Sequence, residues 1–551
     1  MKNSDNRKNK TKVIYMSEQE SNNGNGELET GNPARMKGVV NWWDGFAMAM
    51  AVPALLLYSL GDMASILGVG SIVVWCISTF VAVWLVFGYA ELAGIFKDKT
   101  GGMGVFQYAA WRNSKIVKKH PLLGDVFGVI GIWGYWWAWS PVLAIGGLIV
   151  GHWFTMIFPQ LPATILTFIP TDIAIGTAFL VLLYLINYYG LAGGAKLSWV
   201  LAAATIIPMG ILTVAPWVMG AVDMANFHPF LPLNWATGEL EPSWFTPSAI
   251  YGILGGLFIA WWCVVAYEAA AIYTAEYRDP ARDTYKAITA STIFVAFFYI
   301  FLPITTIGVL GLDGIRTDPL VAIPNIGISV FGETGGIIMM IVMMLGILLA
   351  LNQATNGGGR ALYQMAEDGM IVKQFGILNK HKVPATGMAF DILFNIVLMW
   401  LRAPIVILAA SAIGYCLVNI LANRSVTFMR KNFPDVERPF EMPNWMFALS
   451  KYAFIIVALT LFAAPVFGGT SGTLIGFSVC LIVVGVYGYR KKFQDKPGWK
   501  IWGEDQMPDY MKGQPFADGR PAVGTTRDAI ITITLMLAVL GYIAAIGFWL
   551  A

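Results

Sequence analysis

The stretch FIAWWCVVAYEAAAIYTAEYRDP, residues Phe258 to Pro280, decides how this sequence is interpreted. Its first half is apolar enough to lie in lipid, yet Glu268 lies in the middle of it and charged residues follow at its end. Ionisable residues at membrane depth are costly and rare, and they usually mark function. The stretch therefore predicts a membrane-spanning helix that carries a functional acid.

The composition of the whole chain is that of a membrane protein. The 551 residues are 57% hydrophobic and only 13% charged, whereas soluble domains are about 25% charged. Apolar runs that are long enough to cross a hydrocarbon core of about 30 Å recur along nearly the whole sequence. One water-soluble core cannot bury all of them, so we expect an all-α integral membrane protein.

Hydropathy and turn residues predict about 13 transmembrane helices. The expected ranges are 45–69, 71–95, 124–157, 171–191, 197–220, 248–275, 286–311, 333–357, 386–401, 404–423, 452–468, 472–489 and 528–550.

The distribution of Lys and Arg supports this count. With the N-terminus inside, alternate loops hold 34 of the 36 basic residues, and only Arg316 and Arg402 remain outside. This predicts a multi-pass protein of the plasma membrane with a cytoplasmic N-terminus and an external C-terminus. The net charge of +3 reflects this orientation, and without a basic stacking motif no nucleic-acid partner is expected.

Cysteine and histidine give no sign of a metal site or of catalysis. The four Cys fall in separate apolar runs, and the four His form no cluster. No cofactor is expected, and a nucleophile–base constellation is lacking, so an enzyme is not predicted.

Two predicted spans that lie five apart contain interruptions. Pro53 removes a backbone donor from the first span, which would leave carbonyls near Ala49 and amides near Ala54 free for a ligand. The sixth span has a glycine-rich start before Trp262 and Glu268. The alternatives are a packed kink and a glycine-rich packing face. Transporters built from inverted repeats place discontinuous helices at such corresponding positions.

Four segments resemble the amino acid-polyamine-organocation superfamily of permeases. They are YAELAGIFKDKTGGMGVFQYAAW (Tyr89 to Trp111), the opening stretch with Trp262 and Glu268, NQATNGGGRALYQMAEDGMIVKQF (Asn352 to Phe375), and Arg438-Pro439-Phe440. The resemblance runs from about residue 40 to 490. It implies the leucine-transporter fold, with two inverted five-helix repeats and additional helices, and transport by alternating access.

Composition, hydropathy and the resemblance together predict a domain organisation, in which the thirteenth span is an addition to the family's common plan of twelve. We expect a disordered cytoplasmic tail at 1–35, a ten-helix transport core at 36–430, helices 11 and 12 at 431–490, a cytoplasmic loop at 491–527 and an extra C-terminal helix at 528–551. The triple glycine at 357–359 is interpreted as the flexible end of the eighth span.

By position in the family's motifs, nine residues are expected to bind the substrate. The sequence departs from the family at the first span, where Ala51 to Ala54 replace a glycine-serine-glycine segment, and at Ala266, which replaces a glycine. The expected binding residues are Ala51, Val52, Pro53, Ala54, Trp262, Cys263, Val264, Ala266 and Tyr267.

Three residues are expected to gate or couple transport. Trp262 would cover the substrate from outside, with a cation–π attraction to an ammonium of about 0.5 to 2 kcal/mol; the alternative is a packed or lipid-facing ring. Glu268 would couple gate movement to substrate or proton, or would serve as a structural hydrogen-bond acceptor. Glu276 would belong to an inner gate, or would be an ordinary interfacial charge.

The sequence thus predicts a secondary active transporter for amino acids or related amines in the lipid bilayer, driven by exchange or by protons. The strip from Ala260 to Tyr267 is large and apolar, which favours neutral or aromatic amino acids. One alternative is an exchanger of an amino acid for the amine that its decarboxylation yields. Another class, a non-transporting sensor or a channel, stays open, and so does a homodimer.

Overall fold

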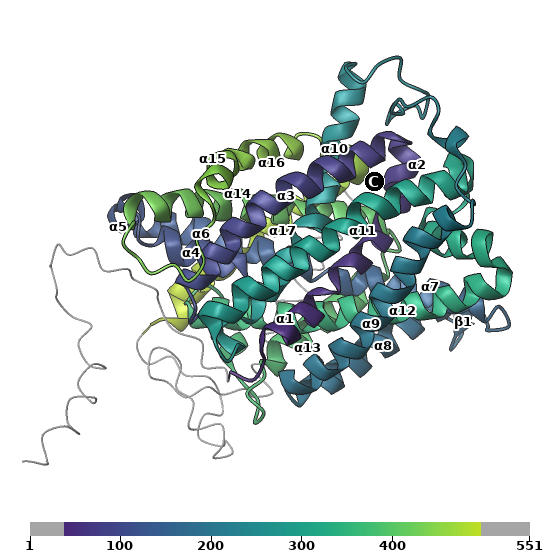
Figure 1. The fold of residues 1–551 in the computed structure, drawn as a ribbon. Helices are drawn as coiled ribbons and strands as arrows, with labels where there is room; N and C mark the ends of the chain where they lie inside the picture. Colours follow the sequence, from purple (N-terminus) through teal and green to yellow (C-terminus); the bar gives the residue numbers. More distant parts are fainter. Residues whose placement is uncertain (1–37, 497–551) are drawn as a thin grey trace, which may run out of the picture.

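The computed structural model describes residues 38–496 as a bundle of long helices (Figure 1). The first half contains α1 (Trp42–Ala49), η1 (Val52–Tyr58), α2 (Leu60–Leu67), α3 (Gly70–Ile95), α4 (Met103–Trp111), α5 (Lys115–Lys119), α6 (Pro121–Trp139), α7 (Val142–Ile157), β1 (Thr164–Ile165), β2 (Ile169–Pro170), α8 (Thr171–Tyr188), α9 (Leu191–Val218), η2 (Met224–Phe227), α10 (Pro247–Val264) and η3 (Val265–Glu276).

The second half has the same helical character. It contains α11 (Pro280–Thr317), η4 (Pro319–Val321), α12 (Ala322–Glu367), η5 (Lys373–Gly376), α13 (Ala385–Met399), α14 (Pro404–Asn432), α15 (Asn444–Ser450), α16 (Ala453–Leu461), α17 (Pro465–Tyr489) and η6 (Arg490–Gln494). The only sheet within residues 38–496 is the antiparallel β1–β2 pair.

The helices confirm an all-α membrane protein. Within residues 38–496, eleven helical segments are long and apolar enough to cross a membrane, and α13 is a shorter apolar helix in the place of the expected span 386–401. Together they correspond to the first twelve expected spans. The expected span 528–550 and the expected tail 1–35 lie outside the described residues.

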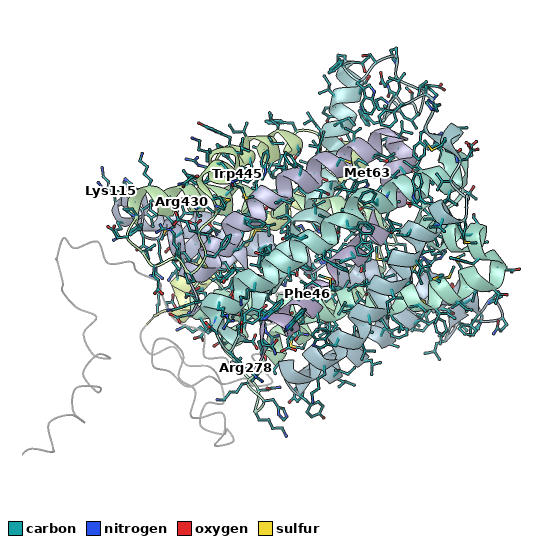
Figure 2. The ribbon with its side chains drawn as sticks, viewed as in Figure 1. Phe46, Met63, Lys115, Arg278, Arg430 and Trp445 are labelled. Atoms are coloured by element: carbon teal, nitrogen blue, oxygen red, sulfur yellow. The ribbon has the colours of Figure 1, made fainter. Side chains whose placement is uncertain are left out.

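Large apolar side chains on the outside of the bundle agree with a lipid surrounding, because a soluble protein rarely exposes so many of them. Examples from different spans are Phe80, Val200, Ile293, Phe462 and Leu481. Several basic residues lie instead toward one end (Figure 2). Figure 2 shows Lys115, Arg278 and Arg430 toward one end of the bundle and Met63 toward the other.

Both spans that were expected to break do change helix type at mid-length. The first span passes from α1 into the 3₁₀ segment η1 at Val52 and returns to α-helix in α2. The sixth span passes from α10 into η3, a 3₁₀ segment of 12 residues. Runs of 3₁₀ helix longer than three or four residues are uncommon and often mark functional hinges. The two interruptions lie in the first and the sixth span, as the two-repeat interpretation requires.

Proline alone does not explain these interruptions. Pro208 and Pro216 lie inside α9, and Pro303 lies inside α11, without ending either helix. A further interruption, which the sequence analysis did not anticipate, divides the third span at Ser140 and Pro141 into α6 and α7. Packing against neighbouring helices therefore decides which prolines end a helix.

The prediction for the triple glycine at 357–359 was wrong. These residues do not form a flexible helix end, because α12 continues to Glu367 and buries all three. A Cβ atom at Gly358 would collide with the Asp391 carboxylate, and one at Gly359 with Met388. The glycines therefore allow α12 to pack closely against α13.

Candidate functional site

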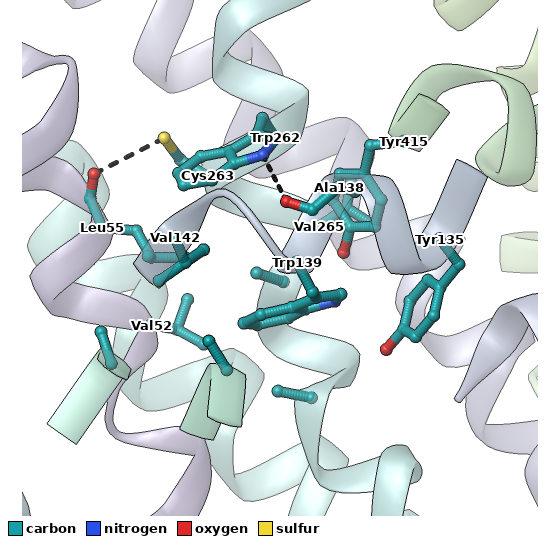
Figure 3. Close-up of a cluster of buried hydrophobic side chains, with 14 of the residues drawn as sticks. Val52, Leu55, Tyr135, Ala138, Trp139, Val142, Trp262, Cys263, Val265 and Tyr415 are labelled. Atoms are coloured by element: carbon teal, nitrogen blue, oxygen red, sulfur yellow. Dashed lines mark hydrogen bonds between the residues drawn. The ribbon is translucent and has the colours of Figure 1, made fainter. Parts of the chain in front are cut away.

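The interrupted spans enclose a small apolar cavity in the middle of the bundle. Its walls come from the first, third, sixth and tenth spans, and its volume is ≈ 10 Å³, about the space of one water molecule. Figure 3 shows the side chains around it. The lining residues are Leu55, Ala138, Trp139, Val142, Trp262, Ala266 and Tyr415.

Trp262 lines the cavity and does not face lipid. Its side chain is only 3% exposed, and its Nε1 donates a hydrogen bond to the Ala138 carbonyl at 2.9 Å (Figure 3). Its ring centroid lies 6.0 Å from that of Tyr58 on η1. The ring is thus held between the first, third and sixth spans, at the place where helix geometry changes.

Hydrogen bonds join the two interrupted spans directly. The Tyr299 hydroxyl on α11 is shared between the main-chain carbonyls of Val52, at 2.8 Å, and Cys263, at 3.2 Å. The Cys263 thiol also lies 3.2 Å from the Ser59 hydroxyl and donates to the Leu55 carbonyl at 3.7 Å (Figure 3). One tyrosine therefore meets main-chain carbonyl groups of both spans.

The expectation of a free amide near Ala54 was wrong. The Ala54 N–H donates to the Ala51 carbonyl at 3.1 Å. The reason is local, because a 3₁₀ segment closes its hydrogen bonds over three residues and thus satisfies an amide that an α-helix broken by proline would leave free.

Glu268 is fully buried behind the cavity wall. Its Oε1 accepts hydrogen bonds from the hydroxyls of Tyr135, at 2.8 Å, and Tyr415, at 3.3 Å. Its Oε2 and the Nε1 of Trp139 do not meet in good hydrogen-bond geometry, but the indole lies close enough to interact with the carboxylate. Tyr415 also lines the cavity, so its hydroxyl connects the Glu268 carboxylate to the cavity. Trp139 is a further lining residue.

The paired glycines before α4 help to position Tyr135. Gly101 and Gly102 have φ of 96° and 77°, which favours glycine. The Gly101 N–H donates to the Ile272 carbonyl on η3 at 2.9 Å, and a Cβ atom at Gly102 would collide with the Tyr135 hydroxyl. The two glycines therefore allow the loop before α4 to lie against both η3 and Tyr135, which donates a hydrogen bond to Glu268.

Glu276 begins a buried polar network at the other end of η3. Arg360 on α12 contacts both of its carboxylate oxygens, one of them at 3.1 Å. Arg360 also donates to Asn356 at 2.9 Å, and Asn356 donates to Asn187 on α8 at 2.6 Å. Asn187 in turn donates to Asn352 at 2.6 Å. The network ties the sixth span to the fourth and eighth spans.

A second buried polar group surrounds the interruption of the third span. The Ser140 hydroxyl donates to Asp391 Oδ1 on α13 at 2.5 Å, and the Asn395 amide donates to Ser140 Oγ at 2.8 Å. Asp391 Oδ2 makes no hydrogen bond of good geometry, although the Trp136 indole lies near the carboxylate, and Asn395 Oδ1 has no partner among residues 38–496. Asp391 is thus a buried acid without a basic partner in the described part of the chain.

Glu91 and Asp279 have structural surroundings. Glu91 accepts from Arg430 at 2.6 Å and from Arg438 at 3.2 Å, which joins the end of α3 to the end of α14 and to the segment after it. Asp279 is the N-cap of α11 and accepts from the Arg282 N–H at 3.3 Å. Neither residue lines the cavity.

The structure brings some of the expected binding residues together and separates others. Trp262 and Ala266 line the cavity, and Val52 and Cys263 meet at Tyr299. The side chain of Tyr267 is outside the described set. The remaining expected residues are buried without lining the cavity: Ala51, Pro53, Ala54 and Val264.

Sequence reasoning missed the walls that the third and tenth spans supply. Ala138, Trp139 and Val142 come from the interrupted third span, and Tyr415 comes from α14. The signal for the third span was present in the sequence YWWAWSP, residues 135–141, where an aromatic run precedes a proline inside an apolar stretch. Nothing near Tyr415 distinguishes it from the other tyrosines of the spans.

Comparison with known proteins identifies similar sequences. The profile of the family described as amino acid permease matches residues 40–487. The D-serine/D-alanine/glycine transporter of Escherichia coli K12 is 23% identical over 62% of this chain and 73% of its own length. The polyamine transporter RMV1 of Arabidopsis thaliana is 22% identical over 69% and 74%. The arginine/ornithine antiporter ArcD2 of Lactococcus lactis is 22% identical over 58% and 63%.

Proposed function

Because this chain belongs to the amino acid permease family, we propose that it moves amino acids or related amines across the plasma membrane by alternating access, as a secondary active transporter. It is a multi-pass membrane protein and a transporter rather than an enzyme.

One observation carries the proposal. The first and sixth spans both change helix type at mid-length, and they meet at the cavity under Trp262 and through the Tyr299 hydroxyl. Discontinuous helices of this kind expose main-chain groups that bind substrate and ions in transporters with inverted repeats. The cavity of ≈ 10 Å³ is too small for an amino acid. We infer that Trp262 and the 3₁₀ segments move when a substrate enters.

The cavity's chemistry supports a small substrate with an apolar body and an amine. The walls are apolar or aromatic, and the indole of Trp262 offers a face for an ammonium group. Trp139, whose indole Nε1 lies beside Glu268, adds a hydrogen-bond donor at the cavity wall. Neutral and aromatic amino acids fit this description first.

A second candidate function is exchange of an amino acid for an amine. Glu268 Oε2 is a buried acceptor behind the cavity wall, and in the first span Ala51 to Ala54, which do not line the cavity, replace the family's usual glycine-serine-glycine segment. This arrangement favours an amine over a carboxylate as the recognised group. The relatives named for polyamines and for arginine/ornithine exchange agree with this candidate.

For coupling and orientation we propose specific roles. Glu268 links gate movement to a proton through Tyr135 and Tyr415, and the Glu276–Arg360 pair closes the cytoplasmic side. The N-terminus lies in the cytoplasm, which agrees with the gathering of basic residues at one end of the bundle (Figure 2). Labelling of single cysteines introduced at Lys115 and at Ser243 with an impermeant thiol reagent in intact cells tests the orientation: only the second should react.

Uptake into proteoliposomes tests the proposed function. The purified full chain is reconstituted, and a panel of labelled amino acids and amines is offered with and without a pH gradient and with loaded counter-substrate. Saturable accumulation with a pH gradient supports proton coupling, and accumulation only with counter-substrate supports exchange. Binding without flux would point to a sensor, and unsaturable flux to a channel; either result would overturn the proposal.

A further inference from the structure

A second, larger cavity lies at the edge of the bundle and shares no lining residue with the cavity under Trp262. It has a volume of ≈ 260 Å³ and opens between the α4–α5 segment, α6 and α14. We call it the edge groove. Its lining residues are Gln107, Trp111, Ser114, Val117, Gly124, Phe127, Gly128 and Leu421.

The walls of the edge groove are mostly apolar, and two glycines shape them. A Cβ atom at Gly124 would collide with Val117, and one at Gly128 with Tyr108, so both glycines let the α4–α5 segment approach α6 closely. Phe127 forms an outer wall and is more than half exposed. Such a groove suits a hydrocarbon chain better than a polar metabolite.

Positive charge lies next to the same groove. Ser114 and Val117, which line it, alternate with the exposed Lys115 and Lys118, and Lys119 follows. Within residues 38–496, none of these three lysines forms an ion pair. The nearby acid Asp125 is engaged with the hydroxyls of Tyr108, at 3.0 Å, and Tyr487.

Trp111 indicates the depth of the groove in the membrane. Its ring stacks on Phe428 with centroids 5.2 Å apart, and its Nε1 donates to the Leu421 carbonyl at 3.3 Å. Tryptophan is enriched at the level of lipid headgroups, where one side of the ring is apolar and the other is wet. The groove thus begins in the apolar region and ends at lysines of the interface, as a phospholipid does.

We propose that the edge groove is a binding site for one anionic phospholipid. One acyl chain lies between Val117, Phe127 and Leu421, and the phosphate lies on Lys115, Lys118 and Lys119. The site is separate from the transport cavity, so it stands or falls independently of the proposed substrate.

Native mass spectrometry of the purified full chain in mild detergent tests this proposal. Dioleoyl phosphatidylglycerol, dioleoyl phosphatidylcholine and inorganic phosphate are added in separate titrations. We expect the chain to retain phosphatidylglycerol at least tenfold better than phosphatidylcholine, and to retain no inorganic phosphate at the same concentrations. The triple variant Lys115→Gln/Lys118→Gln/Lys119→Gln should lower phosphatidylglycerol retention by about tenfold or more, because each lysine near an anionic headgroup contributes attraction.

Two variants examine the apolar part, and one is the matched control. Val117→Trp fills the groove and Phe127→Ala removes its outer wall, so both should lower retention while the lysines remain. The control Lys196→Gln/Lys380→Gln/Lys382→Gln removes three exposed lysines elsewhere and should leave retention unchanged. Equal retention of both lipids, an effect of the control as large as that of the test lysines, or unchanged retention in both groove variants would overturn the proposal.

Discussion

Arg360 and Glu276 form a buried ion pair with two hydrogen bonds, and this pair joins the eighth span to the end of the 3₁₀ segment of the sixth span. Both side chains are almost completely hidden from solvent. A buried pair of this kind often adds little net stability over apolar residues, but removal of one partner leaves an uncompensated charge. Because Glu276 lies at the end of η3 and Arg360 lies on α12, a movement of η3 away from α12 would break the pair.

Glu276→Gln is expected to destabilise the protein by about 3–5 kcal/mol, because Arg360 stays buried without its counter-charge. The double variant Glu276→Leu/Arg360→Met should recover much of this loss and still transport poorly or leak. Thermal unfolding in detergent and proteoliposome flux measure the two effects separately. Arg402→Gln, which breaks an exposed pair with Asp172, should change stability by about 0–1 kcal/mol. Normal, tightly coupled transport by the double variant would show that this pair is not a gate.

Tyr299→Phe removes the hydroxyl that is shared by Val52 and Cys263 and leaves the ring packing in place. We expect a stability loss of about 0.5–1.5 kcal/mol and a clearly larger effect on transport rate, since the hydroxyl holds the two interrupted spans together. Initial uptake rates at saturating substrate measure the effect. Tyr452→Phe, at an exposed position, is the control. An unchanged rate in Tyr299→Phe would show that the bridge is structural only.

Trp262→Ala should reduce uptake at least tenfold, because it removes the ring that covers the cavity and its hydrogen bond to Ala138. The stability loss is expected at about 3–5 kcal/mol, typical of a large-to-small change in a core. Trp262→Phe keeps a ring and should raise KM more than it lowers the maximal rate. The exposed Trp445 provides the matched variant Trp445→Ala. If Trp262→Phe and Trp262→Ala keep normal KM values, the ring does not contact the substrate.

Glu268→Gln separates a coupling role from a structural one. The glutamine carbonyl can accept from Tyr135 and Tyr415, and its amide replaces Oε2, which makes no hydrogen bond of good geometry. The fold should therefore persist, while accumulation driven by a pH gradient is lost and exchange of labelled for unlabelled substrate continues. Flux assays with and without the gradient give the answer. Wild-type accumulation in this variant would mean that Glu268 carries no coupling proton.

Asp391 is expected to tolerate asparagine better than alanine. Asparagine keeps an acceptor for the Ser140 hydroxyl, whereas alanine leaves Ser140 without the hydrogen-bond partner it has in Asp391. The expected loss is about 1–3 kcal/mol for Asp391→Ala and markedly less for Asp391→Asn. Melting temperatures of both variants decide the question. Equal losses would indicate that the negative charge itself is needed there.

The sequence could predict the spans because their signal is local. For twelve of the thirteen expected ranges there is a corresponding helix within residues 38–496. The ends of the helices differ from the expected ends where packing extends or interrupts a helix. The eighth span continues ten residues past its expected end at 357, since glycines allow α12 to lie against α13. The interruption at Ser140 escaped notice because proline in a membrane span does not always end the helix.

The candidate site was less accessible to sequence reasoning. Trp262 and Ala266 were named from a motif and do line the cavity, but Trp139, Tyr415 and Asn187 were not predicted. Each of these depends on which face of a helix turns inward. Where all faces of a helix are apolar, as in a membrane protein, hydropathy does not distinguish the lipid-facing side from the buried side.

The sequence by itself determined that this chain crosses the membrane many times, that its first and sixth spans are candidates for interruption, and that Glu268 lies at membrane depth. These properties follow from the lengths of the apolar runs and from the effect of single residues, such as proline, on the adjacent backbone. Only the tertiary structure decided that Tyr299 meets both interrupted spans and that Glu268 faces Tyr135 and Tyr415. Those contacts join residues more than 30 positions apart, and the packing of one helix face against another determines them.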